Sequence, residues 1–99
     1  MVRYDVSLEA REDLYQIWAY TVDKWSEKQA DQYYAHLENC FQEIAHAPMT
    51  AGKPYDEIIP GIKARHVGRH MVFYTVQDNG RVLIVRILHE RMDYWPKNR

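Results

Sequence analysis

Two segments with the apolar periodicity of a helix, joined by a short break, occupy the first half of this chain. They constrain its fold more than any other feature. Ser7 stands at an N-cap position, and apolar residues then recur at helical spacing up to Trp25. Ser26-Glu-Lys-Gln29 has the form of a capping box, and Pro48 ends the helical pattern that follows. Two helices joined so closely form an antiparallel hairpin. Its apolar stripe must be buried, and the only available surface is one face of a sheet.

The remaining segments supply that sheet. A short alternating segment at 2–6 precedes the hairpin, and strands are predicted at 62–67 and 70–77. Asn79-Gly80 marks a tight hairpin turn, because this pair tolerates positive φ, and the last strand follows at 81–89. The order is therefore β-α-α-β-β-β. We predict a single α+β domain over residues 1–99, with the helical hairpin packed on one face of a small, mostly antiparallel sheet.

Both faces of the predicted sheet are apolar, although two helices can cover only one of them. In 71–76 and 82–89, apolar side chains stand at both alternating sets of positions. Arg86 would lie among aliphatic residues on the second face, which is unusual for a core. We therefore expect another chain to cover this face. The alternative is that the loop at 49–61 folds back over it.

Charge is divided between the two halves of the chain. Residues 1–57 carry five Lys or Arg against eleven Asp or Glu, whereas residues 58–99 carry eight against three. The net charges of the two halves are thus −6 and +5. A basic second half predicts an acidic partner, either a protein segment or a nucleic-acid backbone.

Cysteine, histidine and aromatic residues give weaker signals. A single cysteine, Cys40, cannot form an internal disulfide, and we expect a packed thiol. His66 and His70 flank a Gly-Arg turn, which favours surface histidines over metal ligands. Core and hairpin packing is expected for the helical aromatic residues Trp18, Trp25, Tyr33 and Tyr34. We predict no metal and no cofactor.

The expected compartment is the cytoplasm. The first residues lack the basic region and long apolar run of a signal peptide. No apolar stretch approaches the ~20 residues that a membrane span needs. Nothing in the cysteine content calls for an oxidising environment.

Several short motifs, in this order, resemble the ParE toxins of the RelE/ParE toxin–antitoxin superfamily. The resemblance covers nearly the whole chain and is most specific in the closing run, Val85-Arg86-Ile87-Leu88-His89-x-Arg91-Met92-Asp93. Most of the other matching positions are packing positions. They are Ser7-Leu8, Ala10, Asp13-Leu14, Ile17-Trp18-Ala-Tyr20, Gln29-Ala30-x-x-Tyr33-x-x-x-Leu37, Pro48, Gly61-Ile-Lys-x-Arg65 and His70-x-x-Phe73-Tyr74.

The resemblance implies a toxin that poisons DNA gyrase without catalytic residues and is neutralised by a ParD-like antitoxin. Such an antitoxin binds operator DNA itself and wraps the toxin with a C-terminal segment, so this chain would reach DNA only indirectly. We place the antitoxin on the second sheet face and gyrase on the tail. The predicted antitoxin-binding residues are Met71, Phe73, Ile84, Arg86 and Leu88. The predicted target-binding residues are His89, Arg91, Met92, Tyr94 and Trp95.

Two alternatives remain. A ribosome-dependent mRNA interferase of the RelE/YoeB type needs a base, cations for the developing phosphate charge, and an acid. Residues of these types are Glu57, Arg65, Arg86, His89 and Tyr94. The near-neutral isoelectric point of about 6.5 and the acidic Glu90 and Asp93 in the closing run disfavour a ribosome-binding enzyme. The other alternative is a non-toxic relic that keeps only the antitoxin-binding surface.

Overall fold

The structure is a computed structural model that describes residues 3–91. Its helical hairpin comprises α1 (Leu8–Lys24) and α2 (Glu27–His46). Five strands form one sheet: β1 (Tyr4–Val6), β2 (Lys53–Pro54), β3 (Lys63–Val67), β4 (His70–Val76) and β5 (Val82–His89). The predicted order is confirmed. The segment predicted as a loop also contains a short helix, α3 (Pro48–Ala51), and strand β2.

Both long helices begin where the sequence predicts. The backbone N–H of Ala10 donates to Ser7 Oγ at 3.0 Å, and that of Gln29 donates to Ser26 Oγ at 3.0 Å. Ser7 Oγ also donates to the carbonyl oxygen of Val85 at 2.7 Å. The cap of α1 therefore fixes the start of this helix to β5.

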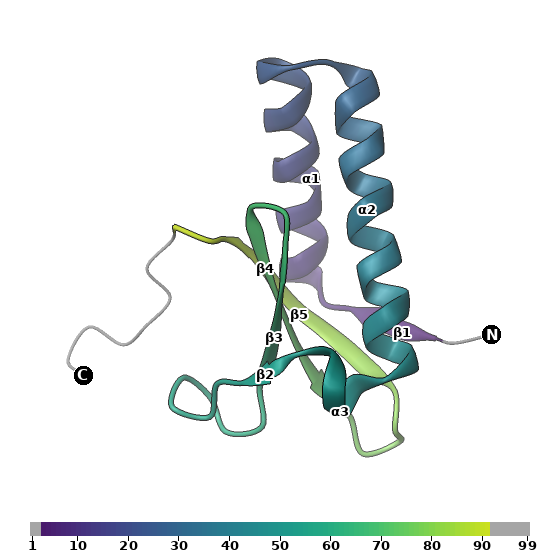
Figure 1. Cartoon of the computed structure of the whole chain (residues 1–99), viewed down its shortest axis with the longest axis vertical. Helices are drawn as coiled ribbons and strands as arrows, with labels where there is room; N and C mark the ends of the chain where they lie inside the picture. Colours follow the sequence, from purple (N-terminus) through teal and green to yellow (C-terminus); the bar gives the residue numbers. More distant parts are fainter. Residues whose placement is uncertain (1–2, 92–99) are drawn as a thin grey trace.

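The sheet has the order β1-β5-β4-β3-β2. β1 pairs with β5 in parallel, and the other three pairs are antiparallel, so the predicted, mostly antiparallel sheet is confirmed. The two long helices lie side by side and extend beyond the sheet at their connecting turn (Figure 1). Trp25, at this turn, is 70% exposed. The distal half of the hairpin is thus more open to solvent than the half over the sheet.

The main core lies between the hairpin and the sheet. Leu37, Phe41 and Ile44 of α2 meet Val72 and Tyr74 of β4, and each is at most 1% exposed. Tyr74 is buried with its polar group satisfied, because its hydroxyl donates to the Pro48 carbonyl oxygen at 2.7 Å. Cys40 is also buried here, and burial raises the pKa of its thiol to about 11, in agreement with a packed cysteine.

The turn between β4 and β5 confirms the predicted hairpin and refines it. The backbone N–H of Gln77 donates to the Arg81 carbonyl oxygen at 2.8 Å, which encloses residues 78–80. Only Gly80 in this turn takes positive φ, at 86°. Asn79 contributes through its side chain, whose Oδ1 accepts the N–H of Arg81 at 2.9 Å.

Candidate functional site

The second sheet face carries a small apolar cluster that the chain itself covers in part. Met71 and Phe73 of β4 are 8% and 3% exposed. Tyr55 and Ile58, from the loop between β2 and β3, pack against them, and the rings of Tyr55 and Phe73 lie 6.1 Å apart. At these residues the structure shows the predicted alternative, in which the loop at 49–61 folds back over the face. The other buried members of the cluster are Ile62 and Ala64.

A β-bulge separates Ile84 from the second face. The pairing of β4 with β5 runs from Phe73 opposite Arg86 to Tyr74 opposite Ile84, so Val85 is an extra residue on β5. The bulge interrupts the simple alternation of side chains along the strand. Ile84 is fully buried in the main core, on the same face as Tyr74. Its predicted place beside Arg86 and Leu88 is therefore wrong.

Arg86 has a partner within this chain. Its Nε and Nη2 donate to Asp13 Oδ2 and Oδ1 at 2.8 and 3.0 Å, which is a bidentate pair between β5 and α1. Asp13 Oδ2 also accepts the backbone N–H of Ile87 at 2.9 Å. Hydrogen bonding to Asp13 raises the pKa of Arg86. An arginine that looked unusual among aliphatic residues is thus explained by an intramolecular carboxylate, while 44% of its side chain stays exposed.

Folding joins the acidic and basic halves of the chain. Three arginines of the basic half pair with carboxylates of the acidic half. These pairs are Arg65–Glu43 at 2.7 Å, Arg81–Asp5 at 2.6 Å and Arg86–Asp13 at 2.8 Å. Among residues 3–91, the basic half keeps Lys63, Arg69 and Arg91 outside any ion pair. Much of the opposite charge of the two halves is therefore used in ion pairs within the fold, and only the remaining basic side chains are available to a partner.

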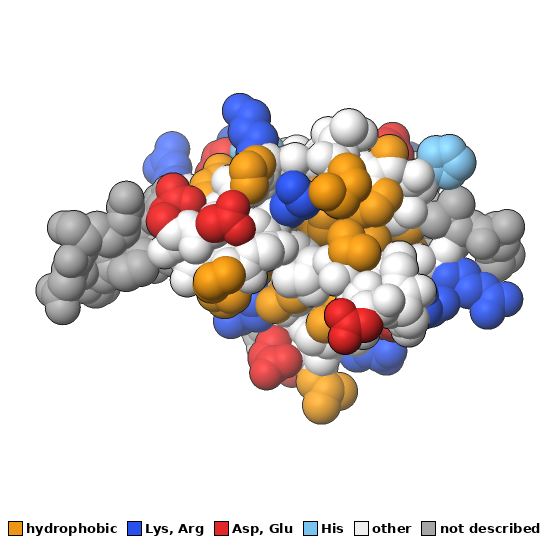
Figure 2. Space-filling model, turned by 90° about the horizontal axis from the view of Figure 1, so that it is seen from below, with side chains coloured by type: hydrophobic (Ala, Val, Ile, Leu, Met, Phe, Trp, Pro, Cys, Tyr) orange, Lys and Arg blue, Asp and Glu red, His pale blue; other side chains and the backbone are white. Residues whose placement is uncertain are grey.

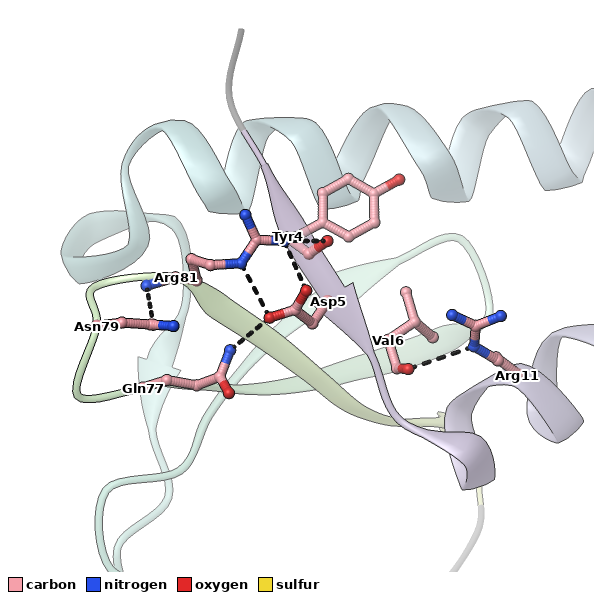
Figure 3. A network of polar contacts seen from close by, with 7 residues as sticks. All are labelled: Tyr4, Asp5, Val6, Arg11, Gln77, Asn79 and Arg81. Atoms are coloured by element: carbon pink, nitrogen blue, oxygen red, sulfur yellow. Dashed lines mark hydrogen bonds and ion pairs between the residues drawn. The ribbon is translucent and has the colours of Figure 1, made fainter.

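The pair at Asp5 fastens β1 to the start of β5 (Figure 3). Arg81 Nε and Nη2 donate to Asp5 Oδ2 and Oδ1 at 3.0 and 2.6 Å, and Gln77 Nε2 donates to Oδ2 at 2.7 Å. Hydrogen bonding to Arg81 and then to Gln77 lowers the pKa of Asp5 to about 2. Among residues 3–91, every donor to this carboxylate comes from the β4–β5 hairpin, so the carboxylate holds β1 to that hairpin.

At the opposite end of the sheet, α2 reaches the turn between β3 and β4. Tyr33 Oη lies 2.7 Å from His70 Nδ1 and 3.2 Å from the Val67 carbonyl oxygen, and it accepts the N–H of Arg69 at 3.1 Å. Burial, and then the neighbouring His89, lower the pKa of His70 to about 4. The ring is therefore neutral at pH 7. Half-buried His70 differs from the surface histidine that the sequence predicted.

The end of β5 lies beside this turn. The His89 ring is 5.4 Å from the His70 ring, and His89 Nδ1 accepts the N–H of Arg91 at 3.1 Å. Two of the predicted target-binding residues, His89 and Arg91, thus lie together at this end. Met92, Tyr94 and Trp95 lie outside the described residues. Sequence reasoning missed Tyr33 and His70, because their contact joins positions 37 apart in the chain.

Exposed apolar residues also line an open groove between α1 and α2. Tyr15 and Trp18 of α1 face Tyr34 of α2 across it. The indole N–H of Trp18 donates to Asp31 at 3.0 Å, which bridges the two helices. Tyr34 is 38% and Trp25 70% exposed, so neither lies in the core, whereas Tyr34 does lie between the two helices of the hairpin.

A second exposed apolar region lies on the side of the molecule where α3 is found. Seen from below, hydrophobic side chains gather into a group with charged side chains around it (Figure 2). Met49 of α3 and Val76 at the end of β4 are among the exposed apolar residues. Exposed apolar surface is therefore divided among several regions and is not concentrated on one sheet face.

Comparison with known proteins decides the family. Residues 4–94 match the family described as the ParE toxin of the type II toxin–antitoxin system parDE. The chain is 40% identical over 91 residues to Toxin ParE1 of Mycobacterium tuberculosis, with 92% of each chain covered. It is 36% identical over 93 residues to Toxin ParE1 of Caulobacter vibrioides, with 94% of each chain covered.

The chain belongs to the ParE toxin family.

Solved structures agree with the fold of this ParE family member. A chain of the chromosomal ParDE system from P. aeruginosa superposes with a TM-score of 0.78 at 17% identity, over 90% of this chain and 96% of that one. A chain of the toxin–antitoxin complex RelBE2 from Mycobacterium tuberculosis gives 0.60 at 25% identity, over 89% and 99%. The predicted RelE/ParE-like fold is therefore confirmed.

The residues considered for an mRNA interferase are dispersed in this ParE chain. Glu57 is exposed in the loop before β3, Arg65 pairs with Glu43, and Arg86 pairs with Asp13. Within residues 3–91, no hydrogen bond, ion pair or ring contact joins any two of Glu57, Arg65, Arg86 and His89. Tyr94 lies outside the described residues.

The described part of the chain offers neither a metal-binding cluster nor a membrane-spanning helix. No group of three or more His, Cys, Asp and Glu side chains there could hold a metal ion. No helix within residues 3–91 is both long and apolar enough to cross a membrane.

Proposed function

We propose that this protein is the toxin of a type II pair, that it poisons DNA gyrase in the bacterial cytoplasm, and that a ParD-like antitoxin neutralises it in a hetero-oligomer. The observation that carries the proposal is the ParE family match over residues 4–94. Relatives named Toxin ParE1 and Toxin ParE, at 36–40% identity over most of their length, support it. Operator DNA is contacted by the antitoxin.

Action by binding, without catalysis, is part of this proposal. Cleavage of RNA needs cations free to stabilise negative charge in the transition state. Arg65 and Arg86, the two described arginines considered for that role, are each held by a carboxylate at 2.7–2.8 Å. This arrangement favours a surface that binds a protein over a site that transfers phosphate.

The antitoxin site is proposed on the second sheet face, with fewer residues than the sequence predicted. Arg86 and Leu88 are accessible. An antitoxin would reach Met71 and Phe73 only by displacing the loop that carries Tyr55. Ile84 is removed from the site because it is fully buried on the helix face. An acidic antitoxin segment would compete with Asp13 for the Arg86 guanidinium.

Induction in bacteria, alone and beside the product of the neighbouring reading frame, tests the function. Filamentation and DNA-damage signalling with intact mRNA are expected, and purified protein should inhibit supercoiling by gyrase. Rapid loss of translated mRNA would contradict the proposal and favour the interferase. An absence of any growth defect would favour the non-toxic relic.

The antitoxin site is tested with Arg86→Glu. We expect affinity for the antitoxin to fall about tenfold or more, because a negative charge then faces an acidic segment. Arg65→Glu is the matched control, since Arg65 is also a partly exposed arginine paired with one carboxylate. Circular dichroism checks the fold of both variants, and Arg86→Ala replaces Arg86→Glu if repulsion from Asp13 unfolds it. Unchanged affinity would refute this placement.

A further inference from the structure

A continuous series of contacts leads from α2 to the end of β5. It begins at Tyr33 of α2, whose Oη lies 2.7 Å from His70 Nδ1. The His70 ring meets the His89 ring edge-on, at 5.4 Å between centroids and 80° between planes. His89 Nδ1 then accepts the backbone N–H of Arg91 at 3.1 Å. β5 ends at His89, so the series continues past the end of the strand to Arg91.

The β3–β4 turn is shaped to receive the Tyr33 hydroxyl. Arg69 donates its backbone N–H to Oη at 3.1 Å, and the Val67 carbonyl oxygen lies 3.2 Å away. Gly68 has φ of +57°, and a Cβ on it would stand 2.7 Å from Oη. Glycine is needed here both for the backbone conformation and for the space that the tyrosine occupies. Tyr33 and the turn therefore hold each other in one position.

A second connection joins the same turn to the end of β5. The backbone N–H of Glu90 donates to the Arg69 carbonyl oxygen at 2.8 Å. Glu90 Oε1 lies 2.7 Å from His66 Nε2, and this hydrogen bond is the first cause of a lowered pKa at Glu90. Pairing between β4 and β5 stops at His70 and His89. Glu90 and Arg91 are therefore positioned by these contacts and not by strand pairing.

We infer that Tyr33 is a positioning residue, which sets the direction in which the chain leaves β5 through His70, His89 and the β3–β4 turn. Its consequence for toxicity rests on the proposed function, in which His89, Arg91 and the residues after them contact gyrase. Tyr33 lies on α2 and need not touch the target. Its hydroxyl accepts the backbone N–H of Arg69 and so gives a partner to a polar group of the turn.

Tyr33→Phe removes the hydroxyl and keeps the ring. Tyr20→Phe is the control, because Tyr20 is 62% exposed near the far end of α1 and its ring remains available to Lys24. Heteronuclear ¹⁵N NOE values should fall at residues 89–91 in Tyr33→Phe and stay unchanged in β1 and in the control. Inhibition of gyrase supercoiling should require about fivefold to tenfold more protein, as expected for the loss of one partly buried hydrogen bond. Affinity for the antitoxin should not change.

A second variant tests the same link in case Tyr33→Phe fails to fold. His70→Phe breaks the link to Tyr33 and keeps an aromatic ring against His89, so it should loosen residues 89–91 in the same way. Unchanged NOE values at 89–91 in both variants would overturn the inference. So would an equal loss of order throughout the sheet together with weaker antitoxin binding, because Tyr33 would then be merely structural.

The experiment separates this inference from the proposed function. If residues 89–91 loosen while gyrase inhibition keeps its potency, the positioning role stands and the end of β5 does not contact gyrase. Deletion of 92–99 in the same assay checks the proposed target site directly. We expect that deletion to reduce gyrase inhibition more than antitoxin affinity.

Discussion

The two faces of the sheet look alike in sequence but are covered in different ways. The helix face meets α1 and α2, and its core includes Leu37, Phe41, Ile84 and Tyr74, none more than 1% exposed. The second face meets an irregular loop, and its cluster has four buried residues with Tyr55, Ile58 and Leu88 packed at its margin. An apolar strand face therefore predicts burial, and it does not say whether a helix, a loop or another protein provides the cover.

The two covers also differ in how they are held. The hairpin has capped helices and is fixed to β5 through Ser7 and Asp13. The loop is held by local hydrogen bonds, such as Tyr55 N–H to the Ile62 carbonyl oxygen at 2.9 Å and Gly61 N–H to Asp56 Oδ1 at 2.8 Å. Segments with few buried contacts open at lower free energy than the core. The second face is thus the more readily uncovered of the two.

The largest effect is expected on the helix face. Leu37→Ala leaves a cavity at a residue that is 0% exposed, and we expect it to lower the free energy of unfolding by about 3–4 kcal/mol. Urea denaturation followed by circular dichroism measures this change. A loss below about 1 kcal/mol would show that the hairpin can collapse onto the space, and the contrast between the faces would fail.

A smaller effect is expected on the second face. Met71→Ala removes a side chain of similar volume, and we expect a loss of about 2 kcal/mol, because the loop can settle toward the cavity. The same denaturation experiment serves, with Leu37→Ala as the matched comparison. A loss equal to that of Leu37→Ala would mean that the loop is held as firmly as the helices.

Acid should lower the stability of the fold through His70, which lies at one end of the helix face. The pKa of His70 is about 4 when folded and near 6.5 otherwise, so the unfolded chain binds more protons between these values. Stability is therefore complete above pH 6.5 and falls as the pH drops toward 4. We expect a loss of about 1–2 kcal/mol between pH 7 and pH 4.5, with allowance for the partial exposure of the ring. His70→Gln should flatten this dependence in thermal melts, and an unaltered slope would contradict the assignment.

The smallest effect is expected at the polar edge of the second face. Asp5→Asn weakens the pair with Arg81, which is open to solvent and screened by salt. The melting temperature should fall less than in any other variant, and the difference from the parent should shrink in about 1 M NaCl. Because the pKa of Asp5 is lowered to about 2, its own contribution is lost only as the pH falls below 3.8. A salt-independent loss larger than that of Met71→Ala would show that this pair contributes more to stability than a solvent-exposed ion pair can.

Local signals made the elements predictable. Ser7 and Ser26 mark the helix starts, and Gly80 marks the last turn, through interactions that span only a few residues. The burial of Cys40 was predictable from its place in a helical pattern. Alternation failed at Val85, because a bulge depends on how β5 fits β4 and α1 together. One inserted residue was enough to move Ile84 from the predicted binding surface into the core.

The sequence by itself determined the elements, their order and the family, because caps, periodicity and motifs can be read over short stretches of chain. It also determined that the two halves carry opposite charge. Only the tertiary structure decided what those charges do: Arg86 meets Asp13 across 73 positions, and Tyr33 meets His70 across 37. A charge or a hydroxyl acts over a few ångströms, so its partner is set by which elements pack together. For that reason the partners of Arg86 and Tyr33 became visible only in the folded chain.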